Sequence, residues 1–211
     1  MTRRTAILLV AILALIGWIV YQRFFTFITN REPRGTNIIA FGDSLTFGMG
    51  VPPHLTWVGL LEKQFGVPII NAGVNGNTTS DALARLQKEV LDRDPKVVIV
   101  ELGGNDLLKR IPASEIEKNL DEIVRRIQDQ GSAVVLLGAD APLGVGGLSG
   151  TVKKLGKKYN TAYCPNIMKG ILGHTSMLLT TDQIHPNSKG HALIAKRVGK
   201  ILHREIPSVF H

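Results

Sequence analysis

Cysteine is almost absent from this sequence, since Cys164 is the single cysteine among 211 residues. One thiol cannot form a disulfide within the chain, and it cannot supply the several thiolates of a cysteine-built zinc site. The five histidines other than His185 show no spacing typical of metal ligands. We therefore expect neither a metal nor a cofactor, while cysteine usage leaves the compartment open between cytosol and periplasm.

Acidic residues are scarce in the C-terminal part of the chain. Residues 148–211 hold ten Lys and Arg but only two acids, Asp182 and Glu205, whereas residues 35–147 hold ten basic and fourteen acidic residues. The formal net charge of +8 is therefore concentrated at the two ends of the chain. No known nucleic-acid motif accompanies it, so we expect no nucleic-acid partner; a basic surface that faces an anionic bilayer is the simpler interpretation.

Charge is also missing from the first apolar run, Thr5–Tyr21 (TAILLVAILALIGWIVY), which Arg3 and Arg4 precede. As a helix this run would span roughly 25 Å, close to the hydrocarbon thickness of a bilayer. No small-residue cleavage site follows it, which favours a retained anchor over a cleaved signal peptide. We predict a membrane anchor and linker in residues 1–34, with a transmembrane helix, followed by one folded domain over residues 35–211.

From residue 36 onward, short apolar runs alternate with longer helical patterns. Strands are predicted at Asn37–Phe41, Val67–Asn71, Lys96–Leu102, Ala133–Leu137 and Thr161–Cys164. Helices are predicted at Leu55–Phe65, Ser80–Val90, Ser114–Gln130, Val152–Tyr159 and Asn187–Leu202. We expect Ser80 to cap the second helix, and Ser114 with Glu117 to form a capping box on the third. The alternation indicates an α/β fold with a parallel sheet covered on both faces.

Small and polar residues gather where the strands of this sheet end. Gly42-Asp43-Ser44-Leu45 follows the first strand, Asn71–Thr78 follows the second, Gly103–Asp106 follows the third, and Asp182–Asn187 lies nearer the C-terminus. Ligands of such sheets bind outside the carboxyl ends of the strands. We therefore expect the four segments to form one site, in which Asp43 bonds loop amides.

Ser44, Asp182 and His185 have the residue types of a nucleophile, an orienting acid and a general base. A serine hydroxyl needs a neighbouring base to attack a carbonyl, and a histidine oriented by a carboxylate provides it. The oxyanion that develops needs fixed donors, for which the N–H of Ser44, the N–H of Gly76 and the side-chain amide of Asn105 are suitable. No G-x-S-x-G elbow surrounds the serine, which disfavours the α/β-hydrolase fold.

The four segments resemble the sequence blocks of the SGNH (GDSL) hydrolases. FGDSLTFG is similar to block I, NAGVNGNTT to block II with Gly76 in the oxyanion position, ELGGND to block III with Asn105, and DQIHPN to block V. The likeness runs from about Asn37 to His203. The phrases NAxxxGxTxxxxLARL and VELGGND are similar to those of the bacterial thioesterase I, arylesterase and lysophospholipase type. It implies a three-layer α/β/α sandwich with a five-stranded parallel sheet (a flavodoxin-like fold) and a metal-independent hydrolase with a shallow acyl site.

The resemblance implies a serine esterase or thioesterase that hydrolyses acyl esters of small molecules or lipids, with lysophospholipids among the candidate substrates. Two alternatives stay open: an O-acetyl esterase acting on cell-envelope carbohydrate, and a catalytically silent lipid-binding protein. Together with the predicted anchor, this gives a single-pass protein of the inner membrane whose catalytic domain lies in the periplasm or elsewhere outside the cytoplasm. Arginines flank the apolar run on both sides, so topology stays undecided, as do acyl-chain length and oligomeric state.

Overall fold

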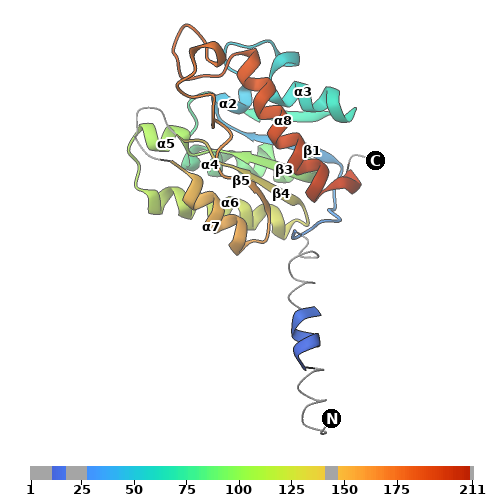
Figure 1. Ribbon diagram of the computed structural model, residues 1–211. Coiled ribbons are helices and arrows are strands. Elements are labelled where there is room, and N and C mark those ends of the chain that lie inside the picture. The colour runs from blue at the N-terminus through green and yellow to red at the C-terminus, as the bar shows by residue number, and fades with distance from the viewer. Residues whose placement is uncertain (1–10, 18–27, 141–146, 210–211) are drawn as a thin grey trace.

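A computed structural model describes residues 11–17, 28–140 and 147–209 of the chain. Within these residues, five parallel strands form one sheet in the order β2-β1-β3-β4-β5. Helices cover both faces of the sheet and produce three layers (Figure 1). The predicted three-layer α/β/α sandwich with a five-stranded parallel sheet is therefore confirmed.

The strands lie within two residues of their predicted bounds, at β1 Asn37–Gly42, β2 Ile69–Gly73, β3 Pro95–Glu101, β4 Ala133–Leu137 and β5 Ala162–Cys164. The α-helices of the domain are α2 Ser44–Phe47, α3 Trp57–Phe65, α4 Thr79–Glu89, α5 Gly104–Leu108, α6 Ala113–Asp129, α7 Ser149–Lys158 and α8 Ser188–Glu205. Short 3-10 turns occupy η1 Pro53–Leu55, η2 Leu91–Arg93, η4 Thr175–Met177 and η5 Pro207–Val209. The five longer helices were predicted, whereas α2 and α5 were not.

Apolar side chains of each strand alternate between two cores, one on each face of the sheet. Ile38 and Ala40 of β1 belong to the core under α3 and α8, while Ile39 and Phe41 belong to the core under α4, α6 and α7. The central strands β3 and β4 are buried along nearly their whole length, as a parallel sheet covered on both faces requires. Each fully buried side chain of this kind contributes about 1.5–3 kcal/mol relative to exposure.

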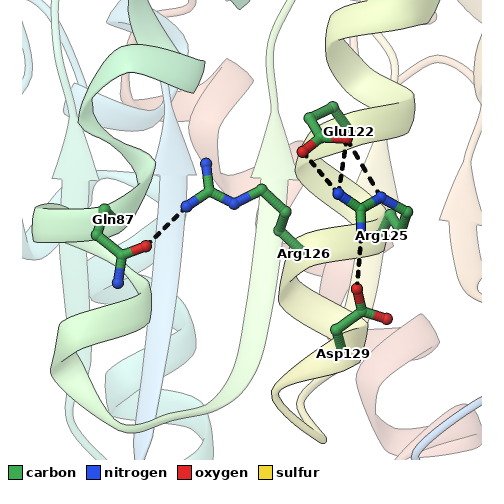
Figure 2. A network of polar contacts seen from close by, with 5 residues as sticks. All are labelled: Gln87, Glu122, Arg125, Arg126 and Asp129. Carbon is green, nitrogen blue, oxygen red and sulfur yellow. Dashed lines mark hydrogen bonds and ion pairs between the residues drawn. The ribbon is translucent and has the colours of Figure 1, made fainter.

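Polar contacts join the outer faces of α4 and α6. Figure 2 shows Arg126 of α6 donating to Gln87 of α4, with 2.7 Å between Nη2 and Oε1. In the same view Arg125 is paired with Glu122 at 2.7 Å and with Asp129 at 2.8 Å, both within α6. Exposed ion pairs contribute about 0.2–1 kcal/mol each, so the buried apolar faces of the two helices, rather than these charges, hold the layer together.

Two linked predictions about the N-terminal apolar run are not supported by the structure. Residues 11–17, the part of this run that the structure describes, are helical and exposed. In residues 11–17, 28–140 and 147–209, no helix is long and apolar enough to cross a membrane. The predicted transmembrane helix is therefore wrong, and so is the single-pass inner-membrane localisation that depended on it. The remainder of the Thr5–Tyr21 run lies outside the described residues.

Candidate active site

Ser44 lies where β1 passes into the short helix α2. Asp43 is the N-cap of this helix, and its Oδ1 accepts the backbone N–H of Leu45 at 2.9 Å. The indole N–H of Trp57 donates to the Leu45 carbonyl, also at 2.9 Å, and ties the turn to α3. Gly42 is required just before the turn, because a Cβ there would collide with a side chain of α2. These contacts fix the serine at the carboxyl end of β1.

His185 connects Ser44 to Asp182. The distance from Ser44 Oγ to His185 Nε2 is 2.8 Å, and the distance from His185 Nδ1 to Asp182 Oδ2 is 2.7 Å. Because an ionised carboxylate only accepts hydrogen bonds, Nδ1 carries the hydrogen and Nε2 faces the serine hydroxyl as an acceptor. The structure thus brings the three side chains together with the mutual geometry of nucleophile, base and acid.

Backbone hydrogen bonds fix the loop that carries Asp182 and His185. Asp182 Oδ1 accepts the N–H of Ile184 at 2.9 Å and the N–H of His185 at 3.0 Å. Burial acts to raise the pKa of Asp182, but these N–H groups and the His185 side chain outweigh it, so the pKa is lowered. Asn187 donates to two carbonyl groups of the preceding segment, both at 3.0 Å, and caps α8. The imidazole therefore has an ionised, oriented partner.

Asn105, near the start of α5, links the loops that follow β1 and β2. Its side-chain nitrogen donates to Asp43 Oδ2 at 3.1 Å and to the Asn77 carbonyl at 3.0 Å. Gly76 precedes that carbonyl in a turn with φ +76°, a conformation that favours glycine. Asn105 is thereby oriented beside the Ser44 turn, and Gly76 is joined to it through the neighbouring residue.

Ser44, Asn105 and His185 line a pocket of about 100 Å³. Its remaining walls are mainly apolar and include Leu45, Leu108, Ala139, Met168, Leu172 and Ile184. Gly76 is not among the described residues that line this pocket. Asp140 lines it and also borders a larger neighbouring cleft of about 770 Å³. The pocket can therefore hold a small apolar group against the serine hydroxyl.

Two polar residues that sequence reasoning did not single out support these loops. Arg85 of α4 donates to Asn77 Oδ1 at 2.6 Å and to the Gly42 carbonyl at 2.8 Å. Asp106 of α5 is fully buried and accepts the N–H and the hydroxyl of Thr79, at 2.9 Å and 2.6 Å. Both belong to phrases that carry the family resemblance, LARL and GGND, and that membership is the signal that could have identified them.

Asp43 and Glu101 place two carboxyl groups beside the site. Burial raises the pKa of Asp43 to about 6, against the lowering effect of the Leu45 N–H, of the Glu101 side chain and of His185. Burial also raises the pKa of Glu101 well above its usual range, and the charge of Asp43 adds to that increase. Glu101 was not singled out from the sequence, because it ends a buried strand, although it is the first residue of the block III phrase ELGGND.

Comparison with known proteins identifies the family. Residues 40–193 match the GDSL-like lipase/acylhydrolase family. Esterase TesA of Pseudomonas aeruginosa is 28% identical over 166 residues, which cover 74% of this chain and 82% of that protein. Thioesterase 1/protease 1/lysophospholipase L1 of Escherichia coli (strain K12) is 27% identical over 186 residues, covering 85% of this chain and 89% of that protein.

The fold agrees with these relatives. A crystal structure of TesA matches with a TM-score of 0.74 at 27% identity, and the match covers 79% of this chain and 98% of that chain. The family match alone spans well over half of the 211 residues. The chain therefore belongs to the GDSL-like lipase/acylhydrolase family, as the sequence blocks predicted, and it is a hydrolase of ester bonds.

Proposed function

We propose that this protein is a serine esterase or thioesterase in which Ser44 is the nucleophile, His185 the general base and Asp182 the acid that orients the imidazole. The observation that carries the proposal is the unbroken hydrogen-bond chain from Ser44 Oγ to His185 at 2.8 Å and from His185 to Asp182 at 2.7 Å. A nucleophile and base within about 2.6–3.2 Å, with a third group behind the base, form the arrangement that activates a serine.

The chemistry follows from these positions. Ser44 Oγ attacks the acyl carbon while its proton moves to His185 Nε2, and Asp182 stabilises the imidazolium that forms. His185 then gives the proton to the departing alcohol oxygen or thiol sulfur, leaving the acyl group on Ser44. A water molecule, deprotonated by the same imidazole, hydrolyses this acyl-enzyme and restores the serine.

Three donors are assigned to the oxyanion: the backbone N–H of Ser44, the backbone N–H of Gly76 and the side-chain amide of Asn105. Support for Asn105 comes from its position in the same pocket as Ser44 and from its fixed orientation. Support for Gly76 comes from the sequence block in which it stands and from its link to Asn105 through Asn77. Donors that are fixed in advance stabilise the transition state without reorganising during the reaction.

The pocket supports small acyl groups as substrates. It encloses about 100 Å³, whereas pockets for drug-sized ligands usually hold about 300–1,000 Å³. The apolar side chains around it suit the first carbons of an acyl chain, so a longer chain, as in a lysophospholipid, would extend beyond the pocket. The same size favours the second candidate, an esterase that removes acetyl groups from carbohydrate.

Hydrolysis of p-nitrophenyl esters of graded chain length, with Ser44→Ala in parallel, tests the proposal. Ser44→Ala is expected to lower kcat about 10⁴- to 10⁶-fold without loss of thermal stability, because the change removes only one hydroxyl. Ser80→Ala is the matched control, since Ser80 is exposed on α4 and its loss is expected to leave the rate unchanged.

The chain-length profile separates the two candidates. Rates that persist from acetate to longer acyl groups, and on thioesters, support the general esterase. Activity confined to acetyl esters supports the carbohydrate O-acetyl esterase. A Ser44→Ala protein that keeps a near-normal rate would refute the assignment of the nucleophile in both.

A further inference from the structure

Two carboxyl groups that the proposed mechanism does not use lie beneath the Ser44 turn. Asp43 is 2% exposed and Glu101 is 1% exposed. In the sheet, Gly42 of β1 pairs with Glu101 of β3, so the Glu101 side chain starts beside the residue that precedes Asp43. The two buried carboxyl groups lie close enough for the charge of Asp43 to act on Glu101. Two adjacent buried carboxylates disfavour each other's charge, so one of the pair takes up a proton.

Asp43 is the member of the pair that is surrounded by donors. Its Oδ1 accepts the N–H of Leu45 at 2.9 Å, and its Oδ2 accepts the side-chain N–H of Asn105 at 3.1 Å. A backbone N–H and a side-chain amide nitrogen can only donate hydrogen bonds. Both oxygens of Asp43 therefore face fixed donors, and this favours the ionised form.

Glu101 has the complementary surroundings. Its Oε2 accepts the hydroxyl of Thr46 at 2.9 Å. Its Oε1 is buried, and no N–H or hydroxyl donor of the described residues reaches it. The Asp43 N–H also acts to favour the charged form of Glu101, but burial outweighs both donors. A buried carboxylate with an oxygen that lacks a donor takes up a proton instead. The proton that the pair holds is thus assigned to Glu101.

The electrostatics of the surrounding groups lead to the same assignment. Burial, together with the nearby charge of Asp43, raises the pKa of Glu101 well above its usual range. Burial raises the pKa of Asp43 only to about 6, because Leu45, Glu101 and His185 all act to lower it while Asp106 acts to raise it. Of the two carboxyl groups, Glu101 is therefore the one that these surroundings favour in the protonated form.

We infer that Glu101 is a carboxylic acid in the working enzyme and donates its hydrogen to Asp43, so that the ionised Asp43 fixes both the turn of Ser44 and the amide of Asn105. Glu101 is then a positioning residue, which touches neither the substrate nor the reacting atoms. This inference rests on the proposed function, because the amide it orients is the proposed oxyanion donor. Without the acid, Asp43 loses a donor, and the hydrogen bonds that direct the Asn105 amide weaken.

Two substitutions of Glu101 separate the role of its hydrogen from the role of its size. In Glu101→Gln the amide nitrogen can donate to Asp43 and the carbonyl can accept from Thr46, so kcat is expected to stay within about threefold of the wild-type value. Glu101→Leu has a similar volume but no donor. It is expected to lower kcat about 10- to 100-fold with KM nearly unchanged, because a misdirected donor acts on the transition state.

Asp43→Asn provides the reciprocal test. The side-chain nitrogen of the new Asn would face the N–H donor of either Leu45 or Asn105, so one of these two hydrogen bonds would be lost. We therefore expect kcat to fall at least as far as in Glu101→Leu. Glu62→Leu is the matched control, since Glu62 Oε1 accepts the N–H of Ile69 at 2.9 Å away from the pocket. That change is expected to lower thermal stability and leave kcat unaltered.

Infrared spectroscopy provides a readout that needs no substrate. At neutral pH the wild-type protein is expected to show the carbonyl band of a protonated carboxylic acid, which disappears in Glu101→Gln and persists in Ser44→Ala. A missing band, a loss of kcat in Glu101→Gln as large as in Glu101→Leu, or an unchanged kcat in Glu101→Leu would each overturn the inference. A wild-type protein that shows the band but hydrolyses no ester would refute the proposed function alone.

Discussion

At the scale of single residues, Asn105 is oriented before any substrate arrives. Its side-chain nitrogen donates to Asp43 at 3.1 Å and to the Asn77 carbonyl at 3.0 Å, so turning the amide would break both hydrogen bonds. Orientation in advance is what makes an oxyanion donor effective. Both hydrogens of the Asn105 amide nitrogen already have acceptors. An oxyanion would therefore share one of these hydrogens with its present acceptor, or replace the Asn77 carbonyl as the acceptor.

Asn105→Ala is expected to lower kcat by about 10²–10³-fold and to leave KM nearly unchanged, because the donor acts on the transition state. It also leaves the buried Asp43 Oδ2 without its donor, which costs about 1–3 kcal/mol of folding stability. Asn119→Ala is a suitable control, since it removes a comparable side-chain hydrogen bond, to Thr79 at 3.1 Å. Steady-state kinetics of both variants below their melting temperatures check the expectation, and an effect on KM alone would contradict the oxyanion role.

Single residues were predictable where a motif carries them. Ser44, Asp182, His185 and Asn105 stand in short blocks of recognisable order, and the structure brings all four to one edge of the sheet. Glu101 also stands in the block III phrase ELGGND, but its role was not identified, because its contact with the turn depends on the register between β1 and β3. Register is a property of the assembled sheet, so the sequence indicates the strand but not the partner of its last side chain.

At the scale of elements, the hydrophobic period located every strand and the five longer helices, but it did not locate their caps. Thr78, not Ser80, is the N-cap of α4, and it forms a capping box with Asp81. α6 begins after Pro112 without a side-chain cap, so the predicted capping box at Ser114 is wrong. Neighbouring Ser and Thr side chains can form equivalent capping hydrogen bonds, and tertiary contacts determine which of these residues becomes the N-cap. Helices of four or five residues, such as α2 and α5, are too short to show a period.

The contact between α3 and α8 depends on a buried histidine. His191 of α8 is 1% exposed, and its Nδ1 accepts the N–H of Trp57, the first residue of α3, at 3.2 Å. That N–H is one of those that a helix leaves without an internal partner. Burial lowers the pKa of His191 to about 4, and nearby His185 acts in the same direction. A protonated imidazole would direct a hydrogen at the Trp57 N–H and oppose the contact.

The contribution of this histidine to the stability of the fold is expected to be lost on acidification. An unfolded chain takes up the proton below the usual value of 6.5, whereas the native protein takes it up only near 4, so stability falls as the pH drops through that window. Between about pH 7 and about pH 5 the contribution is roughly 2 kcal/mol. The raised pKa values of Asp43 and Glu101 act in the opposite direction, because the native protein binds those protons more tightly than the unfolded chain.

His191→Asn isolates the contribution of this residue. The Asn Oδ1 takes the place of Nδ1 as an acceptor but does not titrate. We expect a lower stability at neutral pH, because a buried ring is lost. We also expect the change in stability between about pH 7 and about pH 5 to be more favourable in the variant than in the wild type. Urea unfolding at both pH values measures the difference. The exposed His54→Asn serves as control, and equal pH dependence in His191→Asn and the wild type would contradict the assignment.

At the scale of the whole molecule, the uneven distribution of charge along the sequence is partly balanced in space. Lys154 and Lys158 of α7 lie 2.5 Å from Glu117 and Asp121 of α6, respectively. The basic C-terminal part thus pairs with the acidic middle of the chain across two adjacent helices. Sequence counts gave the asymmetry correctly, but they could not indicate which charges would meet.

The residues just before the predicted domain boundary at residue 35 pack onto the domain. Ile28 is 8% exposed and belongs to the core under α3 and α8. The Thr29 N–H donates to the Asn160 carbonyl at 2.7 Å, and Asn30 Nδ2 donates to the Gln128 and Ser132 carbonyls at 2.9 Å each. These partners precede β4 and β5, at the edge of the sheet opposite the Ser44 pocket. The sequence favoured a linker here because residues 29–35 have little apolar character.

Two truncations are therefore expected to differ in stability but not in chemistry. A chain that begins at Ile28 keeps these contacts, whereas a chain that begins at Gly35 loses a buried side chain, worth about 1.5–3 kcal/mol, and several hydrogen bonds of about 1 kcal/mol each. Part of that loss is offset because fewer residues are ordered on folding. We expect the shorter chain to melt roughly 5–15 °C lower while both keep the same kcat on short esters below that temperature, since the site lies at the far edge of the sheet. Calorimetry and ester assays on the two chains measure this, and equal melting temperatures would show that residues 28–34 do not stabilise the domain.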